Sequence, residues 1–393
     1  MDIPKLVILP GTEDHLLRKE LAAAFTAVGC KAHIADPDKL HDPDHTMRLV
    51  DILDGTPSLL FSINASGLPP LHRTLDICSP SNCQVAIWFV DNPWNVLSGV
   101  KDPGWRDLPL FVTDKSFIDP LKANGAKNVH HLPLAASFEH FAPNLERESA
   151  FPPPDSLAPF VFVGRSAFPG REAFFANIAM PADICKESER MLMQGERPDL
   201  IWWESRLGTR KNLLWPGREA RRPACGAEES NHMWRSLCLV AAAAAGRTRN
   251  AVTGAGEPGL DIFGDLGWRT CLPPGIRLRQ PVDYYARLPG IYRKTPYSLC
   301  LSSMQLPRGL NQRHFDIWAA GGFCLSDTNP GLELFPEELV RPICFKAPDH
   351  IGDVVEHIEK LGIRSSLIND WQALLKEKHS YIHRVNSILE ALQ

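Results

Sequence analysis

Residues 310–327 read Leu310-Asn-Gln-Arg-His-Phe-Asp-Ile-Trp-Ala-Ala-Gly-Gly-Phe-Cys-Leu-Ser-Asp327. The pattern predicts a helix, a Gly-Gly break and a short strand, which is the alternation of an α/β fold. Arg313 and Asp316 lie three residues apart, so a helix brings their side chains onto one side. Burying a carboxylate without a partner is costly, and Asp316 lies in an apolar run. Either Arg313 pairs with Asp316 within the helix, or Asp316 accepts hydrogen bonds from a ligand.

Working outward, the size and composition of the chain limit the possible classes of protein. A chain of 393 residues favours two domains over one core. Its hydrophobic fraction of 44% and charged fraction of 22% are typical of globular proteins, and a net charge of -4 gives no reason to expect nucleic acid as a partner. We find no apolar run long enough for a transmembrane segment, and Lys5–Leu9 is too short for a signal peptide. Scattered cysteines are typical of a reducing compartment, so we expect a cytoplasmic protein.

Before residue 142, predicted strands alternate with predicted helices. Such alternation indicates a parallel sheet with helices on both faces. The expected strands are 5–9, 31–35, 58–64, 84–90, 108–113 and 128–134, and the expected helices are 13–29, 46–53 and 115–124.

Residues 142–159 form the clearest linker, because they include three consecutive prolines. The α/β pattern then restarts. The expected strands are 160–163, 260–263, 297–301, 323–326 and 341–345; the expected helices are 171–180, 232–246, 282–288, 310–320 and 351–361, with one or two more in 366–392. The predicted fold class is therefore α/β, with two Rossmann-like, doubly wound domains at 1–141 and 160–364. Ligands of such sheets bind beyond the carboxyl ends of the strands, so the two domains would face one cleft.

Several motifs resemble one protein family. They are Phe263-Gly-Asp-Leu-Gly-Trp268, the stretch from Tyr284-Tyr285 to Leu288-Pro-Gly-Ile-Tyr292, the 310–323 segment and His379-Ser-Tyr-Ile-His-Arg384. These motifs resemble the CgeB/YkvP-like (spore-protein type) glycosyltransferases, and Trp88-Phe-Val-Asp-Asn-Pro93 is similar to a motif of the domain that accompanies them. The resemblance implies the GT-B architecture, with an acceptor on the first domain and a nucleotide-sugar donor on the second. It also implies that residues 365–393 cross back to the first domain.

The resemblance further implies a reaction. A hexose-type sugar would pass from a nucleoside-diphosphate sugar to a protein or glycan acceptor, without a metal or another cofactor. Many GT-B enzymes that retain the anomeric configuration carry two acids eight positions apart around the helix that corresponds to 310–320. Asp316 falls on the second position, but Arg308 occupies the first. This departure favours an alternative, a non-catalytic nucleotide- or sugar-binding protein. A Rossmann oxidoreductase is disfavoured, because Gly254-Ala-Gly256 precedes its strand.

The donor site is predicted around the start of the 310–320 helix. Free N–H groups there would form an anion site for the diphosphate, and Asp316 would hold the ribose hydroxyls. Arg165 follows a buried strand and suits a diphosphate whose charge grows as the sugar leaves, so we predict a catalytic role for it; the alternative is a surface arginine. The predicted donor-binding residues are Gly164, Arg165, Trp268, Gly309, Leu310, Asn311, Arg313, Asp316 and Gly322. Trp268 would lie near the base or sugar, or else in the core.

The acceptor site is predicted after the strands of the first domain. Asp91 directly follows the 84–90 strand and is the candidate general base; the alternative is a turn-forming residue of Asp-Asn-Pro. Asn64 and Asn92 are the other candidate acceptor-binding residues. The basic segment 202–222 either binds an acidic partner or forms a solvated helix face. We expect no metal site.

Overall fold

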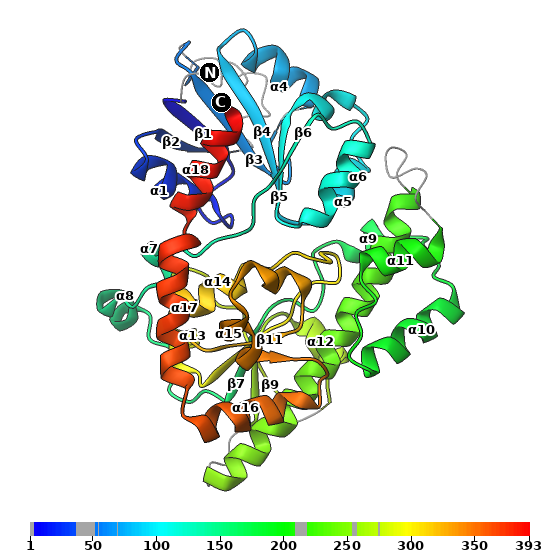
Figure 1. The fold of residues 1–393 in the computed structure, drawn as a ribbon, viewed down its shortest axis with the longest axis vertical. Coiled ribbons are helices and arrows are strands. Elements are labelled where there is room, and N and C mark those ends of the chain that lie inside the picture. The colour runs from blue at the N-terminus through cyan, green and yellow to red at the C-terminus, as the bar shows by residue number, and fades with distance from the viewer. Residues whose placement is uncertain are drawn as a thin grey trace. The chain divides into compact units, whose positions relative to one another are not determined.

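The computed structural model describes residues 4–36, 52–53, 55–68, 70–208, 218–253, 258–273 and 276–393. The chain divides into two compact units (Figure 1). The first is built mainly from Met1–Ala135 and Lys378–Gln393, and the second mainly from Ala136–Lys211 and Glu219–Glu377. Three predicted features lie wholly or partly outside the described residues: the 46–53 helix, the basic segment 202–222 and Gly254-Ala-Gly256.

The first unit contains a parallel six-stranded sheet in the order β2-β1-β3-β4-β5-β6. Its strands are β1 (Leu6–Pro10), β2 (Lys31–Ala35), β3 (Ser58–Ile63), β4 (Cys83–Phe89), β5 (Pro109–Val112) and β6 (Asn128–His131). The apolar runs of β1, β3 and β4 are buried, as expected for strands covered on both faces. The chain changes direction of winding between β1 and β3, which makes that position the switch point of the sheet.

Helices surround this first sheet (Figure 1). They are α1 (Arg18–Ala27), α4 (Leu71–Cys78), α5 (Pro93–Leu97), α6 (Ile118–Ala123) and α18 (Tyr381–Leu392), with short 3-10 turns η1 (Pro103–Asp107) and η2 (Lys115–Phe117). The α18 helix packs beside α1, although the two are far apart in sequence. Arg384 of α18 is buried and donates hydrogen bonds to the carbonyl oxygens of Pro133 (2.7 Å) and Leu134 (3.0 Å), which anchors α18 to the chain after β6.

The second unit contains another parallel six-stranded sheet, in the order β12-β11-β10-β7-β8-β9. Its strands are β7 (Phe160–Val163), β8 (Leu260–Phe263), β9 (Arg277–Arg279), β10 (Tyr297–Cys300), β11 (Cys324–Asp327) and β12 (Cys344–Phe345). The switch point lies between β7 and β10. Strand β9 is not predicted by the sequence, because it contains two arginines and lacks the apolar sequence of a buried strand. Both pair with the fully buried Asp261 of β8.

The helices of the second unit pack around this sheet (Figure 1). They are α7 (Phe138–Phe141), α8 (Leu145–Ala150), α9 (Arg171–Phe174), α10 (Ala182–Met193), α11 (Leu200–Leu207), α12 (Arg218–Thr253), α13 (Leu288–Lys294), α14 (Arg313–Ala319), α15 (Glu337–Val340), α16 (His350–Leu361) and α17 (Arg364–Lys378). The 3-10 turns are η3 (Leu266–Thr270), η4 (Pro330–Leu334) and η5 (Arg341–Ile343). The helix predicted at 282–288 is wrong, because α13 begins only at Leu288.

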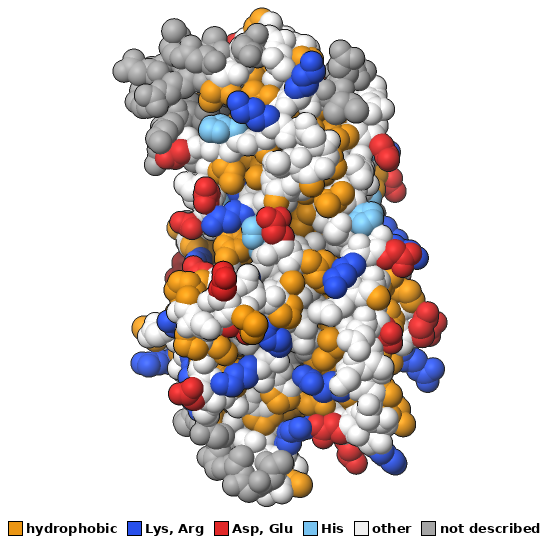
Figure 2. Space-filling view, turned by 90° about the vertical axis from the view of Figure 1, so that its left-hand side faces the viewer, with side chains coloured by type: hydrophobic (Ala, Val, Ile, Leu, Met, Phe, Trp, Pro, Cys, Tyr) orange, Lys and Arg blue, Asp and Glu red, His pale blue; other side chains and the backbone are white. Residues whose placement is uncertain are grey.

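Aromatic stacking fixes α14 against α17. The rings of Trp318 and Trp371 are parallel within 3° with centroids 5.0 Å apart, and both side chains are buried. This packing holds α14 firmly next to β11. On the face drawn in Figure 2, basic and acidic side chains are interspersed over the surface.

Candidate functional site

The carboxyl edge of the second sheet is built from loops that follow β7 and β8. The Asp265 carboxylate after β8 accepts hydrogen bonds from the hydroxyl group of Ser166 (2.6 Å), the backbone amide of Ser166 (3.0 Å) and the amide of Gly267 (2.9 Å). Although burial acts in the opposite direction, these bonds lower the pKa of Asp265. A charged Asp265 therefore ties the β7 loop to the β8 loop at neutral pH.

Gly164 and Trp268 contact one another at this edge of the sheet. A Cβ atom at Gly264 would lie 2.3 Å from the carbonyl oxygen of Gly164, so the two loops approach as closely as a glycine permits. The Trp268 indole is 1% exposed, donates a hydrogen bond to the same oxygen at 2.9 Å and stacks on His232. Trp268 thus positions the loop that contains Gly164 and is buried away from a ligand.

The start of α14 differs from the prediction. The helix begins at Arg313 and not near Leu310. Its first amide groups have internal partners: Arg313 N–H bonds the Asn311 side chain (3.1 Å), His314 N–H bonds the Asn311 carbonyl (3.2 Å), and Phe315 N–H bonds the Gln312 carbonyl (3.0 Å). The amide groups of Arg313, His314 and Phe315 are therefore not free to bind an anion.

Asn311 has a structural task at this edge. Its side-chain amide donates a hydrogen bond to the Leu301 carbonyl at 2.9 Å, and its Oδ1 accepts from Arg313 N–H and from the Cys300 thiol, whose sulfur lies 3.3 Å away. These contacts tether the start of α14 to the end of β10. The side chain of Asn311 is therefore occupied by the protein itself.

Asp316 is fully buried within the second unit. Its carboxylate accepts hydrogen bonds from the Tyr284 hydroxyl group (2.6 Å) and the Gln312 side-chain amide (2.7 Å). Tyr284 in turn packs edge-on against Phe141 of α7, with ring centroids 5.0 Å apart. Because Asp316 is fully buried, a ribose hydroxyl can reach it only if a neighbouring group, such as the Tyr284 hydroxyl group, moves aside.

Arg313 lies next to the switch point between β7 and β10, and Arg235 is near enough to interact with its charge. A Cβ atom at Gly164 would lie 3.6 Å from Nη2 of Arg313, which places Arg313 against the β7 loop. Arg235 of α12 lies close enough to Arg313 to feel its charge: burial lowers the pKa of Arg235, and Arg313 lowers it further. Among the described residues, the enclosed Nε of Arg235 has no hydrogen-bond partner.

Acidic side chains offset part of this positive charge. Glu228 and Asp327 both act to raise the pKa of Arg235. However, burial raises the pKa of Glu228, and the Asp327 carboxylate already accepts hydrogen bonds from Ser302 (2.8 Å), Trp234 (2.8 Å) and Arg197 (3.0 Å). The region around Arg235 and Arg313 therefore favours an anion with several oxygen atoms.

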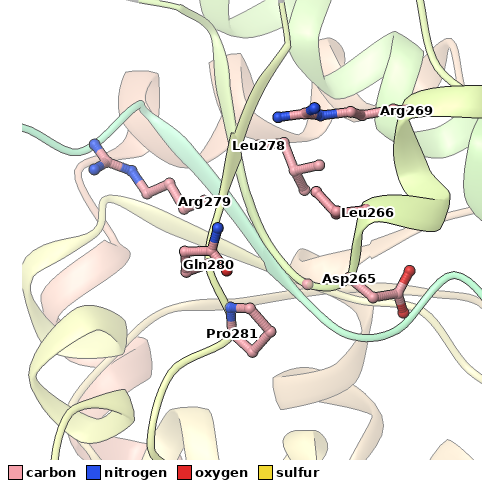
Figure 3. Close-up of a pocket in the computed structure, with 8 residues that line it drawn as sticks. Asp265, Leu266, Arg269, Leu278, Arg279, Gln280 and Pro281 are labelled. Atoms are coloured by element: carbon pink, nitrogen blue, oxygen red, sulfur yellow. The ribbon is translucent and has the colours of Figure 1, made fainter.

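A pocket of about 260 Å³ opens beside these loops, at the carboxyl ends of β8 and β9 (Figure 3). Leu266 and Leu278 point toward one another in it, whereas Arg279 points away toward its partner Asp261. Gln280 and Pro281 complete the wall and also line an adjoining pocket of about 200 Å³. Typical ligand pockets measure roughly 300–1,000 Å³, so the first pocket suits one part of a ligand, such as a planar base.

The remaining predicted donor residues lie in different environments. Arg165 is exposed, directly after Gly164. Gly309 and Leu310 are buried residues of the loop that precedes α14. Gly322 precedes β11 and therefore lies at the opposite edge of the sheet, where a Cβ atom would be 2.6 Å from the Tyr292 carbonyl oxygen. The structure does not bring Gly322 to the other donor residues.

The first unit brings two of the predicted acceptor residues together. Asn64 follows β3 and Asp91 follows β4, and the Asn64 side-chain amide donates a hydrogen bond to Asp91 Oδ2 at 2.8 Å. Asp91 remains exposed, yet the surrounding protein raises its pKa by desolvation while Asn64 opposes that shift. Asn92 is buried, and its Oδ1 accepts from the Trp94 amide at 3.0 Å as the cap of α5. Asn92 therefore has a structural task.

The sequence analysis missed Arg235, Asp327 and Gln280. Arg235 lies on a long helix rather than in a loop after a strand, so its position gave no signal. Asp327 is the last residue of β11 and lies at the carboxyl edge of the sheet, so its position could have identified it as a site residue. Gln280 follows the unpredicted β9.

Two further features are absent from the described ranges. His, Cys, Asp and Glu side chains there do not gather in threes around a possible metal position. Nor does any helix there combine the length and apolarity needed to cross a membrane.

A known protein family matches part of the second half of the chain. Residues 235–390 match a family described as glycosyl transferase-like. The match begins at Arg235 and includes Arg313, Asp316 and Asp327. No curated protein sequence matches the chain.

Solved structures of similar fold cover the whole chain. Sucrose-phosphate synthase from Thermosynechococcus elongatus aligns over 99% of both chains with a TM-score of 0.52 and 10% sequence identity. The apo structure of OtsA aligns over 99% of both chains with a TM-score of 0.50 and 11% identity. At such low identity the likeness establishes the fold alone. The chain has the GT-B fold, with two Rossmann-like α/β domains, which confirms the predicted fold class.

Proposed function

We propose that this protein is a GT-B glycosyltransferase that moves a sugar from a nucleoside-diphosphate sugar to an acceptor bound by the first unit. The observation that carries the proposal is the pair Arg235 and Arg313 at the switch point of the second sheet. Switch points are the places where doubly wound sheets bind their ligands. The family match of residues 235–390 supports the same reaction class.

The arginine pair suits the leaving group of this reaction. As the bond between the sugar and the diphosphate breaks, negative charge grows on the diphosphate oxygens. Guanidinium groups bind such oxygens through charge-assisted hydrogen bonds, and groups that are already in place stabilise the growing charge without reorganisation. Exposed Arg165, next to Gly164, would provide a third cation for the same leaving group. The reaction as proposed therefore requires no metal ion.

The rest of the nucleotide is assigned to neighbouring groups. The pocket beside Gln280 and Pro281 would hold the base. Asp316 would hold the ribose once a ribose hydroxyl replaces the hydroxyl group of Tyr284. The base pocket and Asp316 both belong to the second unit, so one unit would bind both the base and the ribose.

Finer assignments rest on the resemblance stated above. We propose a CgeB/YkvP-like enzyme, a hexose-type sugar, a protein or glycan acceptor and a cytoplasmic location. In the first unit, Asp91 is the proposed general base and Asn64 lies next to it. Asp91 is accessible to an acceptor, because its side chain is exposed.

One observation favours a second candidate, a nucleotide- or sugar-binding protein without catalysis. Arg308 stands where many related enzymes carry an acid. Its guanidinium is 47% exposed and lies 3.6 Å from the carboxylate of Glu333, in an ion pair on the surface. An arginine there cannot supply a carboxylate to the sugar.

A binding experiment followed by a reaction tests the proposal. Thermal shift is measured with UDP, GDP, dTDP and NAD. We expect stabilisation by one nucleoside diphosphate, and release of that diphosphate from the matching sugar nucleotide. Binding without release would favour the second candidate. A response to NAD alone would refute both.

A further inference from the structure

The carboxyl edge of the first sheet contains an unusual backbone conformation. Asn64 directly follows β3, one of the two strands at the switch point, and has φ = 53°. The next residue, Ala65, has φ = 54°. Two consecutive left-handed residues that are not glycine are uncommon and cost energy. The surrounding contacts must therefore hold them in place, and strain of this kind clusters at functional sites.

The side chain of Asn64 supplies those contacts. Its Oδ1 accepts hydrogen bonds from the backbone amides of Val90 (2.9 Å) and Asp91 (3.3 Å). Its Nδ2 donates to Oδ2 of Asp91 at 2.8 Å. One asparagine thus fixes both the backbone and the carboxylate orientation of Asp91, from the neighbouring strand of the sheet.

The carboxylate held in this way is available to a ligand. Asp91 is exposed, and among the described residues its second oxygen has no hydrogen-bond partner. An acceptor hydroxyl group that donates to this oxygen would complete its hydrogen bonding. The neighbouring Asn92 and Pro93 are buried and begin α5, so Asp91 stands on a fixed base.

We propose, on the basis of the proposed function, that Asn64 is the positioning residue for Asp91, which takes the proton of the acceptor hydroxyl group. In this step the acceptor oxygen forms a bond to the anomeric carbon of the sugar. The bond from that carbon to the diphosphate oxygen breaks, and the diphosphate leaves with the electron pair. The hydroxyl proton passes to Asp91, which later releases it to water.

Several charged or titratable groups lie on the elements next to Asp91. On the elements beside it, Arg18 bonds the Pro10 carbonyl oxygen (2.8 Å), Asp114 caps the Ser116 amide (2.8 Å), and His131 lies 3.3 Å from the Thr113 carbonyl oxygen. Lys115 follows Asp114, and His15 is exposed before α1. Within the described part of the chain, desolvation and the Asn64 amide dominate the pKa of Asp91.

Three variants separate the side chain of Asn64 from its backbone strain. Asn64→Gly removes the amide but accommodates the positive φ. Asn64→Asp keeps an oxygen for the Val90 and Asp91 amides but places a carboxylate beside Asp91. Asn82→Gly is the matched control, because Asn82 also has φ = 53° but precedes β4 at the opposite edge of the same sheet.

The first readout does not depend on activity. The protein is labelled with ¹³C at the aspartate side-chain carbons, and Asp91 is assigned with Asp91→Asn and titrated by NMR. We expect the pKa of Asp91 to rise in Asn64→Gly and to rise further in Asn64→Asp, because a like charge replaces a hydrogen-bond donor. Asn82→Gly should leave it unchanged. An unchanged pKa in both Asn64 variants would overturn the positioning role.

The second readout is the pH dependence of sugar release from UDP-glucose, GDP-mannose or dTDP-glucose, whichever the protein uses, with p-nitrophenyl glycosides as probe acceptors. Asn64→Gly should lower kcat/KM by about tenfold at neutral pH and move its acidic limb to higher pH. If activity falls but the acidic limb of the kcat/KM profile stays at the same pH, the role of Asn64 is only structural. If wild-type protein uses none of these donors but the NMR shifts occur, the proposed function fails while the positioning of Asp91 stands.

Discussion

Replacing Arg235 by methionine should stabilise the free protein and weaken diphosphate binding at the same time. Methionine keeps an unbranched side chain at this position of α12 but removes the charge. The guanidinium of Arg235 has an enclosed Nε without a partner among the described residues and lies near the like charge of Arg313. Both features cost free energy in the empty site.

The magnitudes follow from these contacts. A buried donor without a partner costs roughly 1–3 kcal/mol, so removing it should raise the free energy of unfolding by about 1 kcal/mol after loss of its packing is allowed for. A charge-assisted hydrogen bond contributes roughly 1.5–3 kcal/mol, so each lost arginine should weaken diphosphate binding about 10- to 150-fold. Arg313→Met should weaken diphosphate binding to a similar extent.

The assay pairs urea unfolding with calorimetric titration of UDP, GDP and dTDP. Arg247→Met is the matched control, because Arg247 lies on the same helix, is exposed and loses the same charge. It should change neither quantity. If Arg235→Met lowers stability and leaves nucleotide affinity unchanged, Arg235 is a structural residue and the reasoning about the arginine pair is refuted.

Three further outcomes are expected. Desolvation raises the pKa of Asp91 above 3.8, so the protonated carboxyl group stabilises the fold at low pH, and this stabilisation is lost as pH rises through the raised pKa. Asp91→Asn should therefore raise Tm relative to wild type more at about pH 8 than at about pH 4. An equal change at both pH values would contradict the raised pKa. Tyr284→Phe should tighten nucleotide binding, measured by calorimetry, because the ribose then no longer competes with the tyrosine hydroxyl for Asp316; weaker binding would show that Tyr284 itself holds the ligand. Asp327→Asn should lower the free energy of unfolding in urea by about 3–5 kcal/mol, because Arg197 loses a buried partner, and a change below about 1 kcal/mol would count against a charged pair.

Much of the fold follows from sequence because parallel strands of such sheets are apolar along their whole length. The runs at 58–63 and 160–163 have this character, and the structure places both in the centre of their sheets. The exceptions have identifiable causes. Strand β9 contains Arg277 and Arg279, which both pair with Asp261 from another strand, and no local pattern reveals a partner that is distant in sequence.

The candidate site was predictable only where it lies in loops after strands. Asn64 and Asp91 follow adjacent strands, and the sequence places them at one edge. Arg235 belongs to the middle of a helix and reaches the switch point only through the path of α12. The helix start at Arg313 illustrates a different limit. The amide group of Arg313 is not free, because the Asn311 side chain accepts a hydrogen bond from it.

The packing of α18 against α1 has a consequence for biosynthesis. Residues 378–393 complete the first compact unit, yet they are translated after all of the second. The second unit can therefore fold on the ribosome before the first is complete, which reverses the usual order in which N-terminal domains fold first. Until α18 arrives, the face of α1 that packs against α18 stays uncovered in the nascent chain. During that interval the face is an expected binding site for chaperones.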